Sequence, residues 1–177
     1  MNIIESDIKG VVEIIPDIYE DQRGSFLELY NKQTTDLKGT PVEFVQDNLS
    51  YSKENVLRGL HFQKNYPQAK LVTCLMGEIF DVAVDLRKDS ETFGLYVSFL
   101  VSSTKKNLVY IPEGFAHGFC VTSSEALVMY KCSEFYKPKD DYGLRYDDAS
   151  ISIEWPITQP ILSNKDINED KEWEYDR

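Results

Sequence analysis

The sequence predicts an all-β protein, built as a sandwich or jelly-roll barrel with a few short helices. Three observations support this fold class. Apolar and polar side chains alternate in many short runs, turn-forming residues separate these runs at short intervals, and amphipathic helical patterns are scarce. Many short, closely spaced strands are typical of β-sandwiches and barrels. A chain of 177 residues is also expected to form one domain, residues 1–177.

The clearest strand is predicted over residues 79–86. Every second residue from Phe80 to Leu86 is apolar and shares one face, whereas Asp81 and Asp85 share the other face with an alanine between them. Side chains of a strand point alternately to its two faces, so this order predicts two chemically different faces.

Other strands follow from the same alternation. One is predicted over residues 70–76, and Gly77-Glu78 after it is interpreted as a hairpin turn to the strand at 79–86. Short helices are expected near residues 32–37, ended by Gly39, and from Ser163 onward. The remaining predicted strands span residues 11–15, 26–30, 42–46, 56–63, 95–102, 108–111, 115–121, 126–136 and 151–155.

Charge and composition exclude several classes of partner. The formal net charge is −11, and no basic run occurs, so nucleic acid is not expected as a partner. An anionic substrate would need local arginines and lysines. No stretch has the length and hydropathy of a membrane span, and the N-terminus lacks the pattern of a signal peptide, so a cytoplasmic protein without a membrane partner is expected. The three cysteines lie in apolar runs and are interpreted as core residues.

Histidine is scarce, which bears on metal binding. The two histidines, His61 and His117, are 56 residues apart, and no His-x-His pattern occurs. A transition-metal site needs three or four protein ligands, so no metal is expected. His61 is either a structural histidine or a proton carrier, a role that imidazole suits near neutral pH. His117 lies between glycines in a loop-like stretch, where it lines a pocket or braces a turn.

Two further residues and one short segment have two interpretations each. Ser163-Asn-Lys-Asp166 has the spacing of a helix start, so Asp166 is explained locally by capping rather than catalysis. Tyr130 is a core tyrosine or a pocket residue. The segment Asp21-Gln-Arg-Gly24 is interpreted as a turn, with an anion site as the second interpretation. The residues alone therefore predict an all-β protein but no substrate.

At this point the order of motifs along the chain resembles a known family, the dTDP-4-dehydrorhamnose 3,5-epimerases, which have a cupin-like jelly-roll fold. The resemblance covers nearly the whole chain. The matching segments are Asp21-x-Arg-Gly-x-Phe-x-Glu28, Gln46-Asp-Asn48, Ser50-x-Ser-Lys-x-Asn-Val-Leu-Arg-Gly-Leu-His-Phe-Gln63, Lys70-Leu-Val72, Gly77-Glu-x-Phe-Asp-Val-Ala-Val-Asp85, Ile111-Pro-Glu-Gly-Phe-Ala-His-Gly-Phe119, Tyr130-Lys131, Trp155-Pro156 and Leu162-Ser-x-Lys-Asp166.

The resemblance implies a reaction and four catalytic residues. The substrate of the family is a 4-keto-6-deoxyhexose on a nucleoside diphosphate, dTDP-4-keto-6-deoxyglucose, whose ketone acidifies the hydrogens at C3 and C5. The resemblance makes His61 the base, with Asp166 orienting its ring. It assigns Lys70 to the negative charge on the C4 oxygen and Tyr130 to proton return on the other face. No metal, nicotinamide or other cofactor is implied.

Substrate contacts and assembly are implied in the same way. Arg58 and Arg23 resemble diphosphate contacts, and Arg23 is expected to reach the site of the partner subunit in a homodimer through an exchanged N-terminal segment. His117 lines the sugar pocket. The other implied substrate-binding residues are Phe26, Glu28, Gln46, Asn48, Tyr136 and Lys165. Converging arginines offer paired donors to a diphosphate, which explains how a chain of this charge binds an anion.

Two departures from the family pattern leave alternatives open. The stretch Gly143-Leu-Arg-Tyr-Asp-Asp148, with Arg145-Tyr146 at its centre, lacks the usual Trp-Asn pair, and Ser25 stands where the family often has an aromatic residue. Besides a 3,5-epimerase, the sequence is compatible with a related mono-epimerase or 3,4-ketoisomerase acting on a similar nucleotide sugar. A sugar-nucleotide binding module without catalysis is disfavoured, because every implied catalytic position is filled.

Overall fold

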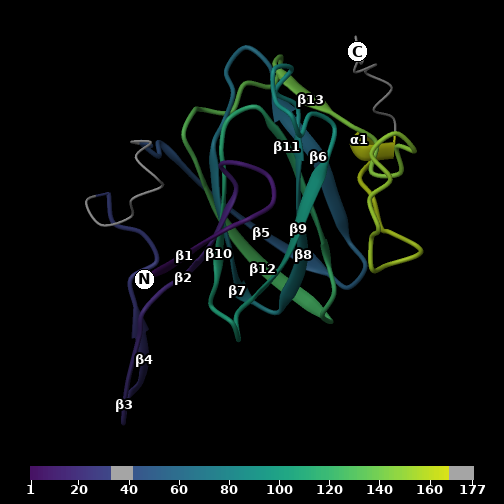
Figure 1. Cartoon of the computed structure of the whole chain (residues 1–177). Coiled ribbons are helices and arrows are strands. Elements are labelled where there is room, and N and C mark those ends of the chain that lie inside the picture. The colour runs from purple at the N-terminus through teal and green to yellow at the C-terminus, as the bar shows by residue number, and fades with distance from the viewer. Residues whose placement is uncertain (33–41, 168–177) are drawn as a thin grey trace.

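Two antiparallel β-sheets face each other in the computed structural model, which describes residues 1–32 and 42–167 (Figure 1). The six-stranded sheet has the order β1 (Asn2–Glu5), β2 (Val12–Ile15), β10 (Leu108–Ile111), β7 (Lys70–Met76), β12 (Glu125–Cys132) and β5 (Gln46–Lys53). The five-stranded sheet has the order β13 (Asp141–Gly143), β6 (Leu57–Gln63), β11 (Phe115–Val121), β8 (Glu78–Asp85) and β9 (Tyr96–Ser102). The predicted all-β jelly-roll class is confirmed.

Two short elements lie outside the sandwich. Strands β3 (Ile18–Asp21) and β4 (Gly24–Leu27) form a separate hairpin, which protrudes from the body of the protein at the lower left of Figure 1. Helix α1 (Asn164–Ile167) lies beside the five-stranded sheet and contacts β6. The backbone N–H of Asp166 donates to Ser163 Oγ, so Ser163 caps this helix and the predicted start is confirmed.

The main core fills the space between the sheets. Inward side chains such as Val72 of β7, Val128 of β12 and Ala83 of β8 form one buried cluster. A second cluster covers the outer face of the five-stranded sheet, where Val82 and Val84 pack with residues of the segment 144–155. Strand β8 is therefore buried on both faces. Its aspartates lie on the inward face, although the sequence alone did not show which face points inward.

The structure corrects one predicted turn. Gly77 has a φ of +80°, and a Cβ at this position would lie 2.0 Å from the Glu125 carbonyl oxygen, so a glycine is required. However, β7 and β8 belong to different sheets. The predicted hairpin is wrong, because Gly77 turns the chain across the sandwich instead of pairing adjacent strands.

Several predicted strand boundaries are wrong as well. Residues 42–45 precede β5 and pack on the outer face of the six-stranded sheet, and the segment predicted to reach 136 leaves the sheet after Cys132. Residues 151–155 are not a strand, because they cover the five-stranded sheet through side chains. Of the strand predicted at 26–30, only residues 26 and 27 belong to β4, which spans Gly24–Leu27, and residues 28–30 are not in a strand. The helix predicted near 32–37 lies outside the described residues apart from Lys32.

A close approach of two glycines brings the two histidines together. A Cβ on Gly59 would lie 2.7 Å from Gly118 Cα, and a Cβ on Gly118 would lie 2.7 Å from the Arg58 carbonyl oxygen. Strands β6 and β11 can therefore approach closely here, next to a register shift between His117 and Phe119. His61 and His117 are directly opposed in this pair of strands.

Candidate active site

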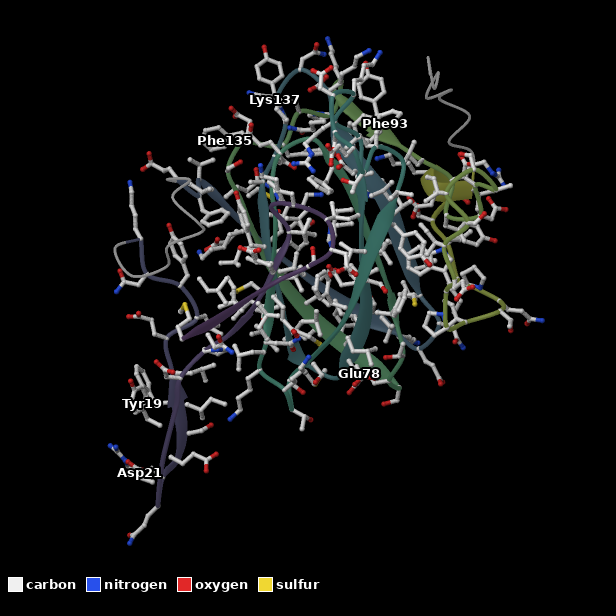
Figure 2. All side chains as sticks on the ribbon, in the orientation of Figure 1. Tyr19, Asp21, Glu78, Phe93, Phe135 and Lys137 are labelled. Carbon is white, nitrogen blue, oxygen red and sulfur yellow. The ribbon has the colours of Figure 1, made fainter. Side chains whose placement is uncertain are left out.

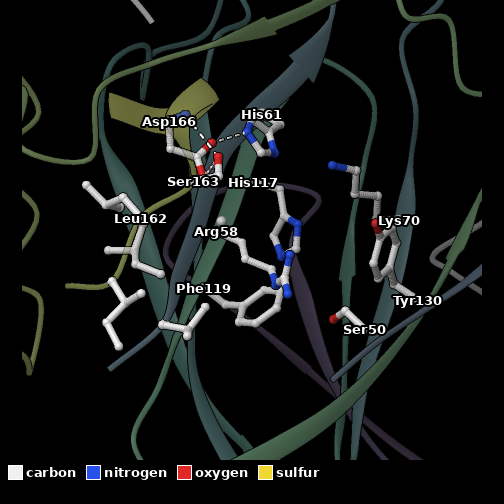
Figure 3. Close-up of a pocket in the computed structure, with 14 residues that line it drawn as sticks. Ser50, Arg58, His61, Lys70, His117, Phe119, Tyr130, Leu162, Ser163 and Asp166 are labelled. Carbon is white, nitrogen blue, oxygen red and sulfur yellow. Dashed lines mark hydrogen bonds and ion pairs between the residues drawn. The ribbon is translucent and has the colours of Figure 1, made fainter. Parts of the chain in front are cut away.

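Two adjoining cavities open between the sheets, where β6 faces β12 and β5. One has a volume of about 360 Å³ and the other about 280 Å³, and both are lined by His61, Lys70 and Tyr130. Figure 3 shows His61 with Asp166 on one side of the larger cavity and Lys70 with Tyr130 on the other. His61 lies on the five-stranded sheet, whereas Lys70 and Tyr130 lie on the six-stranded sheet. The site is thus built from both sheets.

His61 and Asp166 form a hydrogen-bonded pair. The distance from His61 Nε2 to Asp166 Oδ1 is 2.7 Å. The histidine side chain is 31% exposed and the carboxylate 3%, so the imidazole faces the cavity while the acid is enclosed behind it. Because the carboxylate accepts at Nε2, the second ring nitrogen, Nδ1, is the atom left to accept a proton.

Asp166 combines the two roles that the sequence left as alternatives. Ser163 caps α1 through the backbone N–H of Asp166, and its hydroxyl also donates to Asp166 Oδ2 at 2.9 Å. Burial by itself raises the pKa of Asp166, but the hydrogen bonds from His61 and Ser163 outweigh it, and the pKa lies below the ordinary value of 3.8. The carboxylate is therefore charged at neutral pH and holds both the ring and the helix start.

The facing wall carries a buried amine and a phenol. Lys70 is 9% exposed, and burial lowers its pKa against the opposing effects of Cys132 and Asp141. Burial also raises the pKa of Tyr130, so this hydroxyl keeps its proton at neutral pH. Across the cavity from the imidazole, the neutral phenol is a proton donor, and the N–H groups of Lys70 are hydrogen-bond donors that can stabilise a developing negative charge.

His117 has a different environment from His61. It lies within β11, which corrects the expected loop, and it is 6% exposed while lining the cavity wall. Its Nε2 lies 2.7 Å from Asp81 Oδ1, and burial lowers its pKa despite this carboxylate. A neutral, carboxylate-oriented His117 is suited to hydrogen bonding with a bound sugar rather than to proton abstraction.

Arginine and polar groups mark the ends of the two cavities. Arg58 lines the larger cavity, and its Nε donates to Ser52 Oγ at 2.9 Å. Gln46, Asn48 and Tyr136 line the smaller one, where Gln46 Nε2 donates to Asn48 Oδ1 at 2.9 Å. The resemblance implied Arg58, Gln46, Asn48 and Tyr136, and the fold brings them to cavities that the catalytic candidates also line.

The predicted binding residue Lys165 lies at the rim rather than in the lining. Its Nζ and the Tyr136 hydroxyl both donate to Asp141 Oδ2, at 2.5 and 2.8 Å. Asp141 itself lines the smaller cavity. The three side chains thus connect β13, α1 and the segment after β12.

Three predicted contacts lie far from this chain's own cavities. Arg23 and Phe26 are on the protruding hairpin, where Arg23 pairs with Asp21 at 2.5 Å and Phe26 is 70% exposed. Figure 2 shows Tyr19 and Asp21 of the same hairpin well away from the sandwich. Glu28 follows the hairpin and accepts from Asn31 at 3.1 Å. The fold of one chain does not bring Arg23, Phe26 or Glu28 to the site.

Several polar residues of the site were not singled out from the sequence. They are Ser50, Gln63, Asp81 and Asp141. Among the described residues, two buried side-chain oxygens have no hydrogen-bond partner, Ser50 Oγ and Asp81 Oδ2, and both belong to this region. Unsatisfied buried oxygens are typical of a site that a ligand completes. The sequence offered one signal for these residues, namely aspartates on one face of an otherwise apolar strand. Among the four residues, this signal pointed to Asp81.

The departures from the family pattern lie outside the lining of both cavities. Arg145 pairs with Asp147 at 2.9 Å, and the Tyr146 carbonyl accepts from Trp155 Nε1 at 2.8 Å. Ser25 is on the hairpin, where its hydroxyl accepts from Lys106 Nζ at 2.8 Å. These residues brace the outer segment and the hairpin instead of touching the catalytic candidates.

Within residues 1–32 and 42–167, histidine, cysteine and carboxylate side chains do not gather in any group of three able to hold a metal ion. No helix of this part is long and apolar enough to cross a membrane. The three cysteines are free and buried, as predicted. What the site offers is acid–base chemistry. The fold and the site together define a jelly-roll protein with proton-carrying groups on two facing walls.

Comparison with known proteins gives the family. The family model for dTDP-4-dehydrorhamnose 3,5-epimerase matches residues 5–172, and the chain belongs to this family of cupin-like epimerases. A dTDP-4-dehydrorhamnose 3,5-epimerase of Shigella flexneri is 50% identical over 173 residues, which are 97% of this chain and 96% of that protein. A dTDP-4-dehydrorhamnose 3-epimerase of Streptomyces niveus is 41% identical over 90% of this chain and 78% of its own.

A solved structure shows the same likeness in three dimensions. It is a dTDP-6-deoxy-D-glucose-3,5-epimerase of Legionella pneumophila in complex with dTDP-4-keto-L-rhamnose, with a TM-score of 0.90 and 46% identity. The match covers 94% of this chain and 89% of that one. The resemblance inferred from the motifs is thus confirmed.

Proposed function

We propose that the protein epimerises C3 and C5 of dTDP-4-dehydro-6-deoxy-D-glucose and so forms dTDP-4-dehydro-L-rhamnose. One observation supports this most directly: a carboxylate-bound imidazole faces a phenol and a buried lysine amine across one cavity. Inversion at a carbon beside a ketone needs a base on one face of the sugar ring and an acid on the other. Groups from two facing sheets meet this requirement, since a sugar ring bound between them presents one face to each sheet.

The proposed chemistry moves only protons and electron pairs. His61 Nδ1 takes the proton from C3 or C5, and the C–H electrons form an enolate with the C4 carbonyl. Lys70 stabilises the negative charge that develops on the C4 oxygen, as donors of an oxyanion hole do. Tyr130 returns a proton to C5 from the opposite face, and water returns one to C3. The phenolate then recovers its proton from water, and the protonated His61 gives its proton up to water. This sequence of steps uses no metal and no nicotinamide.

Substrate binding is proposed around the same space. Arg58 binds the diphosphate with its planar guanidinium, which suits phosphate oxygens. Gln46, Asn48 and Tyr136 of the smaller cavity bind the nucleoside, with Lys165 at the rim, and His117 contacts the sugar. The ligand named for the Legionella pneumophila structure, dTDP-4-keto-L-rhamnose, supports a deoxythymidine nucleotide sugar as the substrate.

Deuterium exchange tests this function against its nearest alternative. With dTDP-4-keto-6-deoxyglucose in D₂O, we expect NMR to show deuterium entering both C3 and C5, together with the L-rhamno product. The 3-epimerase relative makes single-site action the specific alternative, and deuterium at one carbon alone would support it. A protein that binds dTDP but exchanges neither position is a binding module, which contradicts the proposal.

The active unit is proposed to be a homodimer with an exchanged N-terminal segment. Arg23, Phe26 and Glu28 lie too far from this chain's cavities to serve them, and the protruding hairpin exposes Phe26 and Tyr19 to solvent. Large exposed aromatic side chains on one hairpin are typical of a protein interface. In the proposed dimer, this hairpin completes the partner's site. A cytoplasmic location and the absence of nucleic-acid and membrane partners stay predictions.

Subunit mixing tests the exchange. His61→Ala and Arg23→Ala chains are each expected to be inactive as homodimers. After verified subunit exchange, a mixed dimer should regain activity, because one of its two sites keeps both His61 and Arg23. Activity assays of the mixture against each parent measure this. A mixture that stays inactive shows that Arg23 serves the site of its own chain.

A further inference from the structure

The segment that follows β12 has an unusual support for its backbone. The sheet ladder ends at Cys132, and residues 134–137 continue along the upper rim of the sandwich, where Figure 2 shows Phe135 and Lys137. Backbone groups of these four consecutive residues bind glutamine side chains. The Glu134 carbonyl accepts from Gln68 Nε2 at 2.7 Å, and the Tyr136 N–H donates to Gln46 Oε1 at 3.0 Å.

Gln63 makes the central contacts of this set. Its Oε1 accepts from the Lys137 N–H at 2.7 Å, and its Nε2 donates to the carbonyl oxygens of Phe135 at 3.3 Å and Tyr66 at 2.7 Å. Gln63 is the last residue of β6 and is 7% exposed. One buried amide therefore ties the segment 134–137 to the loop after β6. We call Gln46, Gln63 and Gln68 the glutamine clamp.

The glutamine clamp matters because it holds the backbone on both sides of Tyr136. Tyr136 lines the smaller cavity, yet it is 51% exposed and its hydroxyl reaches only as far as the rim at Asp141. The backbone that carries this ring is held directly, because Gln46 binds the Tyr136 N–H and Gln63 binds the Phe135 carbonyl and the Lys137 N–H on either side of it. Buried side chains that satisfy backbone groups restrict a loop before a ligand arrives, which lowers the entropy lost on binding.

We propose that Gln63, supported by Gln68, is a positioning residue that pre-orders Tyr136 for the base of the nucleotide. This inference rests on the proposed function, since it takes a nucleoside diphosphate as the ligand of the smaller cavity. Gln63 lines the smaller cavity, but both N–H groups of its amide are donated to backbone carbonyls and its oxygen accepts from the Lys137 N–H. It acts through Tyr136, and its loss should therefore weaken nucleotide binding without changing the chemical step.

The test replaces Gln63 by methionine, which keeps the length of the side chain and removes all three hydrogen bonds. We expect the Kd for dTDP and the KM for the nucleotide sugar to rise about tenfold, with kcat changed by less than about twofold. Hydrogen exchange at the Lys137 amide should become faster in the ligand-free protein. Gln159→Met, the same exchange on an exposed residue, should match wild type in all of these measurements.

A double-mutant cycle separates positioning from a general loss of stability. Tyr136→Ala should weaken dTDP binding by a similar factor, and adding Gln63→Met to it should weaken binding no further, because the two changes remove the same contribution. Should Gln63→Met fail to fold, Gln68→Met removes only the bond to the Glu134 carbonyl. This second variant is expected to raise the Kd about threefold in the same direction.

The proposal is overturned if Gln63→Met binds dTDP as tightly as wild type does. It is also overturned if Gln63→Met weakens dTDP binding by the same factor with Tyr136 present and with Tyr136 replaced by alanine. Failure of the proposed function gives a different result. In that case wild-type protein neither binds dTDP nor exchanges deuterium into the sugar, and the role of the clamp in nucleotide binding falls with it. A wild type that does both, beside a Gln63→Met variant that does both equally well, contradicts the clamp alone.

Discussion

Replacing His61 by asparagine is expected to lower kcat by about 10²- to 10⁴-fold, the range for a positioned acid–base group. Asparagine has no group that takes a proton near neutral pH, and the described part of the chain offers no second imidazole with an exposed face. His117 is buried against Asp81. Both C3 and C5 should lose deuterium exchange, because the proposed mechanism assigns one base to both carbons.

Folding should be little affected by this change. The His61 side chain is 31% exposed, and asparagine is too short to replace the bond from Nε2, but Asp166 keeps its hydrogen bond from Ser163. Thermal unfolding and dTDP binding are the controls, and both should stay close to wild type. A variant that folds, binds dTDP and turns over at the normal rate shows that another group is the base. Exchange retained at one carbon only assigns that carbon to a different base.

Replacing Asp166 by asparagine is expected to reduce kcat by about two orders of magnitude or more. The carboxylate accepts from His61 Nε2 and leaves Nδ1 free to act as the base. An asparagine that accepts from Ser163 through its oxygen turns its NH₂ group toward His61. The imidazole must then accept at Nε2 and carry its proton on Nδ1, the wrong tautomer for abstraction. The same substitution in the serine protease triad has this effect.

Stability measurements separate this role from helix capping. The cap itself is the Ser163 hydroxyl, which binds the backbone N–H of residue 166 and survives the substitution. We therefore expect the Tm of Asp166→Asn to stay within a few degrees of wild type. A Tm lowered by many degrees, together with normal turnover, contradicts the catalytic role. Ser163→Ala should lose about 0.5–2 kcal/mol of stability, as for other caps, and its kcat should fall less than that of Asp166→Asn.

The pKa of Asp166 adds a pH dependence with a defined sign. Its pKa is lowered in the folded protein, so the charged carboxylate contributes stability above the ordinary value of 3.8. That contribution is lost as the pH falls through the folded-state pKa. Any stability difference between wild type and Asp166→Asn should thus be full at neutral pH and shrink in acid. Urea unfolding at a series of pH values measures it.

Much of the site was predictable only through family resemblance. Local sequence explained Asp166 as part of a helix start and left Tyr130 open between a core tyrosine and a pocket residue. Ser163 does cap the helix at Asp166, and Tyr130 both packs against the core and lines the cavity. What local sequence could not give was the distance between residues 105 positions apart. His61 and Asp166 meet because α1 returns to the edge of β6, a contact that no periodicity encodes.

The sequence by itself determined the class of this protein. Alternating side chains in short runs require a pleated sheet with two different faces, and that local property predicts an all-β fold without knowledge of strand order. The cap at Ser163 and the glycine at Gly77 are local as well, because they depend on the backbone of neighbouring residues.

Only the tertiary structure decided which strands pair and what the inward faces enclose. Gly77 begins a crossing between sheets, not a hairpin, because the pairing of β7 with β10 and β12 depends on residues far away in the chain. Likewise, Gln63 became visible as the centre of a clamp only when β6, β12 and the loop between residues 64 and 69 were placed together. Side-chain hydrogen bonds to a distant backbone follow from packing, and packing depends on the whole chain at once.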